Sequence, residues 1–158
     1  MGKINMGRVL LGGIVAGLVA NVLGYLVDGL LLAPRWADGL MALGREDFVP
    51  GQWIWFNVLG LIGGITVIWI YASIRPRFGA GPMTAVLAGF VVWVVGSLIP
   101  NVSFMLIVGL FSHRLAAYTT AGALVEIVAG SLAGAALYKE SARKPVPSDQ
   151  VRAMPRTH

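Results

Sequence analysis

The sequence contains no cysteine, only two histidines and few charged residues. The lack of cysteine excludes disulfides, thiolate metal sites and cysteine nucleophiles. His113 and His158 are far apart in the sequence and have no matched set of further ligands, so no metal site is predicted. Charged residues make up 12% of the chain and hydrophobic residues 57%, which is far from the balance of soluble domains. This composition predicts an integral membrane protein with no metal ion or other cofactor.

Long apolar stretches, each bounded by charge or proline, indicate helices that cross a bilayer. Each stretch is close to the roughly 20 residues that a spanning helix needs. The predicted spans are residues 9–32, 53–74, 82–99 and 117–138. The third span can extend to residue 111, either as a helix kinked at Pro100 or as a re-entrant segment. We therefore predict an all-α bundle of four transmembrane helices over residues 1–140.

The last residues of the chain, 141–158, combine prolines with charged side chains. Such a composition lacks the apolar residues that a packed core requires. A disordered cytoplasmic tail is therefore predicted after the bundle.

Basic residues are concentrated at one end of the predicted bundle. Only Arg35, Arg45 and Arg114 fall on the side opposite the termini. Because basic residues favour the cytoplasmic side, both termini are predicted to lie there. The net charge of +5 would then face anionic lipid headgroups. No basic stripe interleaved with aromatic residues lies outside the spans, so nucleic acid is not an expected partner.

The connection between the first two spans has an amphipathic pattern. Its apolar residues are Trp36, Leu40, Met41 and Leu43, and its charged residues are Asp38, Arg45, Glu46 and Asp47. A short helix that lies on the outer leaflet is predicted from this pattern.

The first span shares part of its sequence with the third. Ala16, Gly17, Val19, Val22, Gly24 and Leu26 recur 72 residues later as Ala88, Gly89, Val91, Val94, Gly96 and Leu98. The second and fourth spans match only at Gly63 with Gly130 and at Tyr71 with Tyr138, at a different offset. Two interpretations stay open: a parallel duplication of a helical hairpin, or coincidence between apolar helices.

Small residues recur at spacings of three and four, which places them on shared helix faces. These faces carry Gly13, Gly17, Asn21, Gly24 and Asp28 in the first span, Asn57, Gly60 and Gly64 in the second, and Gly122, Glu126, Gly130 and Gly134 in the fourth. Small residues allow membrane helices to approach closely. The faces are therefore predicted to contact protein, either within the bundle or in another subunit.

Glu126 and Asn21 lie near the middle of their spans, at about the same depth. A carboxylate at the centre of a spanning helix costs about 2.5 to 3.5 kcal/mol on insertion scales. We predict that Glu126 faces the bundle, is largely protonated, and is hydrogen-bonded to Asn21 or to a backbone carbonyl. Three roles are open for it: a proton-relay or coupling acid, a structural link between helices, or a contact to another subunit.

A second set of polar residues falls in the outer half of the membrane. Its members are Asp28, Asn57, Asn101 and Arg114. They predict either a shared polar vestibule, with Arg114 paired to Asp28, or simple solvation and capping close to the headgroups.

The layout of the chain also carries a resemblance. A glycine-rich first helix is followed by an outer segment with Pro34, Trp36 and Met41 leading to Leu43, Gly44, Glu46 and Asp47, and then by a third helix with Gly89, Phe90, Trp93 and Pro100. This order resembles an uncharacterised bacterial family of small four-helix integral membrane proteins, over most of residues 10–138. The resemblance implies a four-span fold in a bacterial cytoplasmic membrane and brings no catalytic residues.

No phosphate-binding loop, hydrolase triad or pair of midplane carboxylates is present in the sequence, so no enzymatic activity is expected. The leading prediction is an accessory or scaffolding subunit of a membrane complex, or a bundle that associates with itself. The alternative is a small proton-coupled transporter or channel, dimeric, with Glu126 as the coupling acid.

Overall fold

The computed structural model describes residues 4–46, 48–49 and 51–139. Its elements are α1 (Met6–Gly24), η1 (Tyr25–Leu31), α2 (Ala33–Ala42), α3 (Gln52–Phe78), α4 (Pro82–Trp93), η2 (Val94–Leu98), η3 (Asn101–Ile107) and α5 (His113–Leu137), where η marks a π-helical segment. The described part of the chain contains no strand, which confirms the all-α prediction. The predicted tail over 141–158 lies outside the described residues, as does Asp47 of the amphipathic segment.

Four helices within the described ranges are long and apolar enough to cross a membrane, as predicted. They cover Met6–Leu31, Gln52–Phe78, Pro82–Ile107 and His113–Leu137. The third remains helical past Pro100, so of the two predicted alternatives the structure has the continuous helix. Pro100 lies between η2 and η3. Such local π-helical turns let a membrane helix satisfy the backbone groups that a proline frees.

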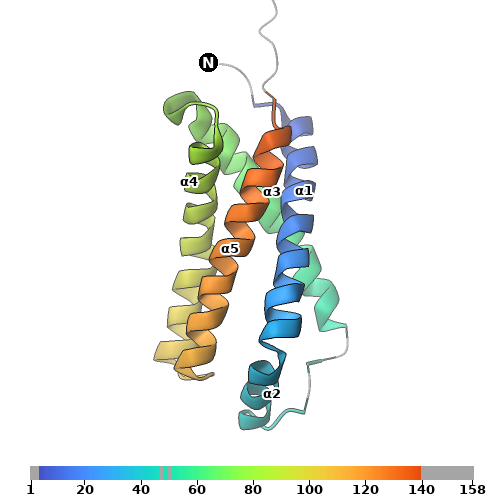
Figure 1. The fold of residues 1–158 in the computed structure, drawn as a ribbon, viewed down its shortest axis with the longest axis vertical. Helices are drawn as coiled ribbons and strands as arrows, with labels where there is room; N and C mark the ends of the chain where they lie inside the picture. Colours follow the sequence, from blue (N-terminus) through green and yellow to red (C-terminus); the bar gives the residue numbers. More distant parts are fainter. Residues whose placement is uncertain (1–3, 47, 50, 140–158) are drawn as a thin grey trace, which may run out of the picture.

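The four long helices alternate in direction and form one bundle (Figure 1). The start of α1 and the end of α5 lie at one end of the bundle, here called the termini end, and α2 lies at the other, the α2 end. α1 packs against α3 and α5, and α4 packs against α5 and α3. The turn from α3 to α4 contains Gly79 at a φ of 86°, a conformation that glycine adopts without strain.

The buried core lies toward the termini end. It consists of Val9, Ala16, Val67, Ile68, Tyr71, Ala72, Ala85, Ala88, Ala135 and Tyr138. Many other apolar side chains remain exposed on the outer faces of the helices, including Leu18, Ile62 and Phe90. Exposed apolar side chains on spanning helices indicate contact with lipid, and the four spans together indicate a multi-pass membrane protein.

The predicted short helix of the connecting segment is α2, but part of its apolar face points to protein rather than to a leaflet. Leu40 is buried, and the ring of Trp36 lies 5.2 Å from the ring of Phe111. Gly39 makes this approach possible, because a Cβ atom there would lie 2.8 Å from the ring of Phe111. Of the four predicted apolar residues, only Met41 and Leu43 are exposed, so the predicted leaflet-facing surface is smaller than expected.

Candidate functional site

Two rows of small residues on α1 face two different helices. Gly13, Gly17 and Asn21 face α3, whereas Gly12, Ala16 and Gly24 face α5. A Cβ atom at Gly17 would lie 2.7 Å from the Cα atom of Leu61, and one at Gly12 would lie 2.6 Å from the carbonyl oxygen of Gly134. Residues four apart form a row along an α-helix, and neighbouring rows point in different directions. α1 therefore lies between two close helix contacts.

The position of Gly24 corrects the prediction that it shares one face with Gly13, Gly17 and Asn21. The step of three residues from Asn21 to Gly24 moves from the α3-facing row to the α5-facing row. The remaining predicted packing glycines lie at contacts inside the chain: Gly60 and Gly64 on α3 meet Asn21, Gly13 and Gly17, while Gly122, Gly130 and Gly134 on α5 meet Val27, Ala16 and Gly12.

Glu126 belongs to the α5 row that packs against α1, and its carboxyl group lies beside Gly24. A Cβ atom at Gly24 would lie 3.2 Å from Oε2 of Glu126, so the glycine leaves the space that the carboxyl group occupies. Oε1 of Glu126 is buried and has no hydrogen-bond partner in the described part of the chain. Glu126 thus faces protein with one oxygen unused.

The predicted hydrogen bond between Glu126 and Asn21 is wrong. The side-chain nitrogen of Asn21 donates instead to the carbonyl oxygen of Asn57 on α3, at 3.0 Å. The physical reason is the helix row: Asn21 points to α3, and Glu126 contacts the other row of α1.

Asp28 is the second acid of the site, in η1. It follows Gly24, the neighbour of Glu126, by four residues, and its Oδ1 accepts a hydrogen bond from Nε1 of Trp36 on α2 at 3.1 Å. The predicted pair with Arg114 does not form within the described residues, because Asp28 is bonded to Trp36 and Arg114 is exposed. Two carboxyl groups and one indole therefore make up the polar centre at this interface, here called the acid site: Glu126, Asp28 and Trp36.

The predicted outer polar group does not come together as one vestibule. Asn57 donates to the carbonyl oxygen of Trp53 on its own helix at 2.8 Å. Asn101 donates to Oγ1 of Thr120 at 2.9 Å, which links η3 to α5. These two residues and Asp28 therefore serve three separate contacts.

Sequence reasoning missed two hydrogen bonds between α4 and α5. Nε1 of Trp93 donates to the carbonyl oxygen of Thr120 at 2.8 Å, and Oγ of Ser131 donates to the carbonyl oxygen of Ala85 at 2.7 Å. Ser131 is fully buried. A polar residue within an apolar span was the signal that singled out Glu126, and the same signal could have identified Ser131. Trp93 donates to a backbone carbonyl, which every residue has, so its partner carries no sequence signal.

The chemistry open to the acid site is proton exchange at a carboxyl group. Among residues 4–46, 48–49 and 51–139, no three side chains of histidine, cysteine, aspartate or glutamate come together to hold a metal ion. Comparisons of the chain with models of protein families, with curated proteins and with solved structures found no match. The resemblance to the uncharacterised four-helix family therefore stays a prediction.

Proposed function

We propose that this chain is a small proton-coupled transporter in which Glu126 is the coupling acid. The observation that carries the proposal is the buried Oε1 of Glu126, which has no hydrogen-bond partner in the described part of the chain. A carboxyl group kept only as a link between helices would use its oxygens in hydrogen bonds. An ionisable group within a membrane span that leaves an oxygen unused is suited to take up and release a proton.

Asp28 extends the acid site toward the α2 end. It follows Gly24, the neighbour of Glu126, by about one helical turn, or roughly 6 Å along the axis. Two carboxyl groups at successive depths provide successive positions for a proton. We infer that protons reach Glu126 from the α2 end by way of Asp28.

The opposite side of Glu126 is closed in this conformation. Toward the termini end, Val9 and Ile68 are fully buried in the core. Gly12 and Gly134 bring α1 and α5 into close contact there. Coupled transport would therefore require the helices at the termini end to separate after Glu126 has been protonated.

The distribution of basic residues supports an orientation for this cycle. Arg75, Arg77 and Lys139 lie at the termini end, and Arg45 and Arg114 lie toward the α2 end. By the positive-inside rule, we infer that the termini end is cytoplasmic, against anionic headgroups of a bacterial cytoplasmic membrane. Protons would then enter from the outer side.

Equivalent contacts in two hairpins support a parallel duplication. A Cβ atom at Gly17 would lie 2.7 Å from Cα of Leu61, and one at Gly89 would lie 3.2 Å from Cα of Val128. Gly89 follows Gly17 by 72 residues and Val128 follows Leu61 by 67, the offsets at which the two pairs of spans match in sequence. We propose that α1–α3 and α4–α5 derive from one hairpin, as in other transporters built from repeats.

Proton flux into liposomes tests the function. The full chain, purified and reconstituted, is expected to carry protons down an imposed pH gradient, detected with an entrapped pH-sensitive dye. Glu126→Gln keeps the size of the side chain, removes its exchangeable acid proton and is expected to reduce the flux to that of empty liposomes. Glu46→Gln is the matched control, because Glu46 is exposed outside the spans and should leave the flux unchanged. Equal flux in the two variants would exclude Glu126 as the coupling acid.

The accessory or scaffolding role was predicted from glycine faces expected to pack against one another or against other subunits. In the structure these glycines lie at contacts between helices of the same chain. That role stays a prediction and is tested separately by purification in a mild detergent. A second protein that co-purifies at a fixed ratio would favour it over transport.

A further inference from the structure

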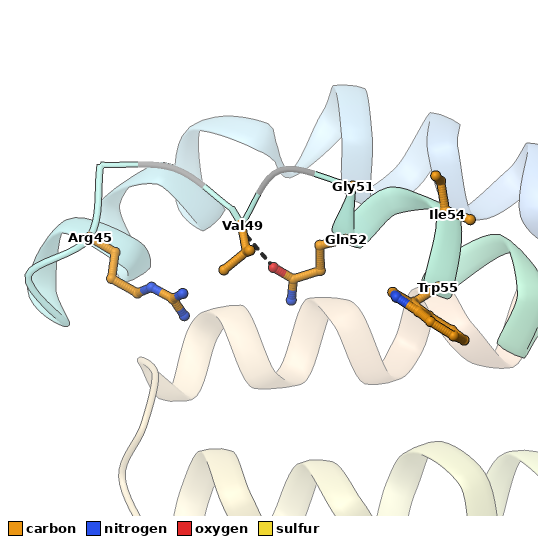
Figure 2. Close-up of a pocket in the computed structure, with 6 residues that line it drawn as sticks. All are labelled: Arg45, Val49, Gly51, Gln52, Ile54 and Trp55. Atoms are coloured by element: carbon orange, nitrogen blue, oxygen red, sulfur yellow. Dashed lines mark hydrogen bonds between the residues drawn. The ribbon is translucent and has the colours of Figure 1, made fainter.

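A groove lies where the connecting segment enters α3, at the α2 end of the bundle (Figure 2). It has a volume of about 470 Å³ and is lined by Arg45, Val49, Gly51, Gln52, Ile54 and Trp55. The guanidinium group of Arg45 and the amide nitrogen of Gln52 lie on the same side of the backbone, and the indole of Trp55 is on that side too. The acid site does not contribute to this groove.

Hydrogen-bond donors dominate the polar lining of the groove. Among the described lining residues, the one side-chain acceptor is Oε1 of Gln52, which accepts a hydrogen bond from the backbone nitrogen of Val49 at 3.0 Å. The guanidinium of Arg45, the amide nitrogen of Gln52 and the indole nitrogen of Trp55 remain as donors. Among the described residues, no aspartate or glutamate lines the groove, and Asp47 lies outside them. Hydrogen-bond donors together with the positive charge of Arg45 are suited to bind an anion.

The surroundings of the groove favour an anion that carries acyl chains. Trp55, Leu59 and Ile62 are all exposed and are spaced by four and three residues, so they form an apolar stripe along one face of α3. This stripe leads from the groove into the membrane span. Tryptophan at the start of a span is typical of the headgroup level of a bilayer. A ligand with a charged head and apolar tails matches both parts of this surface.

We propose that this groove binds the headgroup of an anionic phospholipid of the leaflet at the α2 end. The phosphodiester accepts hydrogen bonds from Arg45, Gln52 and Trp55, and an acyl chain lies along Leu59 and Ile62. Of the other basic residues toward this end, Arg35 lies over the ring of Tyr118, 4.8 Å from its centroid, and Arg114 does not line the groove. The lipid site is independent of the transport proposal, since Glu126→Gln should leave lipid binding unchanged.

Native mass spectrometry of the full chain in detergent tests the site, with phosphatidylglycerol and phosphatidylethanolamine as probes. The wild type is expected to retain phosphatidylglycerol in preference to phosphatidylethanolamine. Arg45→Gln is expected to lower the retained phosphatidylglycerol about fivefold, the usual contribution of one arginine near an anionic surface. Gln52→Glu keeps an oxygen for the bond from Val49, replaces the donor by a negative charge, and is expected to lower retention at least as much. Arg114→Gln is the matched control and should retain lipid like the wild type.

Several results would overturn the lipid site. Equal retention in the wild type and Arg45→Gln would remove Arg45 from the site. Equal losses in Arg45→Gln and Arg114→Gln would show non-specific attraction to positive charge. Equal retention of the two lipids would exclude selection for an anionic headgroup. Displacement of the lipid by millimolar inorganic phosphate would identify a site for a free anion instead.

Discussion

The two ends of the bundle are held together by different interactions. At the termini end, the helices are regular and small residues bring their backbones into contact, as at Gly13, Gly64 and Gly134. Toward the α2 end, the first and third spans become π-helical, and hydrogen bonds from Trp36 and Asn101 connect the elements. Directional bonds can exchange partners, whereas close backbone contacts cannot be altered without separating the helices. The α2 end is therefore expected to change shape more readily, whereas the termini end opens only when its helices separate.

The largest expected effect comes from adding a methyl group at the termini end. A Cβ atom at Gly64 would overlap the backbone of Gly13 and Gly17, so Gly64→Ala should lower the free energy of unfolding by about 2 to 3 kcal/mol. The neighbouring Gly63 has no atom within 4 Å of the position of its Cβ, and Gly63→Ala is the control. Helix content during titration with a denaturing detergent measures both. Similar unfolding of the two variants would contradict the close packing described for this end.

An intermediate effect is expected at the α2 end. Trp36→Phe keeps an aromatic ring against Phe111 but removes the donor to Asp28, a bond worth roughly 1.5 kcal/mol to a charged acceptor. Hydrogen exchange of the amides in α2 should accelerate about tenfold, with little change in α3. Trp53→Phe is the matched control, because Trp53 is exposed and its ring makes no hydrogen bond within the described residues. Unchanged exchange in α2 would show that the aromatic contacts alone hold this helix in place.

The smallest effect is expected for a hydrogen bond at the termini end. Ser131→Ala removes the bond to the carbonyl oxygen of Ala85 and should lower the free energy of unfolding by about 0.6 kcal/mol, the average for such bonds in membrane proteins. Ser73→Ala is the control, because Ser73 is exposed and donates to Trp69 within its own helix. A loss as large as that expected for Gly64→Ala would mean that hydrogen bonding holds the two ends alike.

The spans could be predicted from the sequence because transfer of a helix into lipid depends on its own composition. The helix after Leu32 could also be predicted locally, because Trp36 and Leu40 recur at the spacing of one helical turn. The continuation of the third span past Pro100 could not, since it depends on π-helical turns that no residue pattern specifies. Secondary structure was thus predictable where it depends on local composition.

The partners of the polar residues were not predictable in this way. Nearly every face of α1 is apolar, so periodicity does not define how the helix is rotated about its axis. Gly12 and Gly13 are adjacent in the sequence, yet they face different helices. Asn21 and Glu126 point to different neighbours, because depth along a helix does not specify rotation about it.

The place of α1 between α3 and α5 has a consequence for the assembly of the protein during synthesis. Chains are made from the N-terminus, so the contact between α1 and α3 can form while the residues of α5 have yet to be added. The row with Gly12, Ala16 and Gly24 contacts α5, so it faces lipid until the final span is inserted. Glu126 is therefore the last residue of the acid site to enter the bilayer, and the space beside Gly24 is already present to accommodate its carboxyl group.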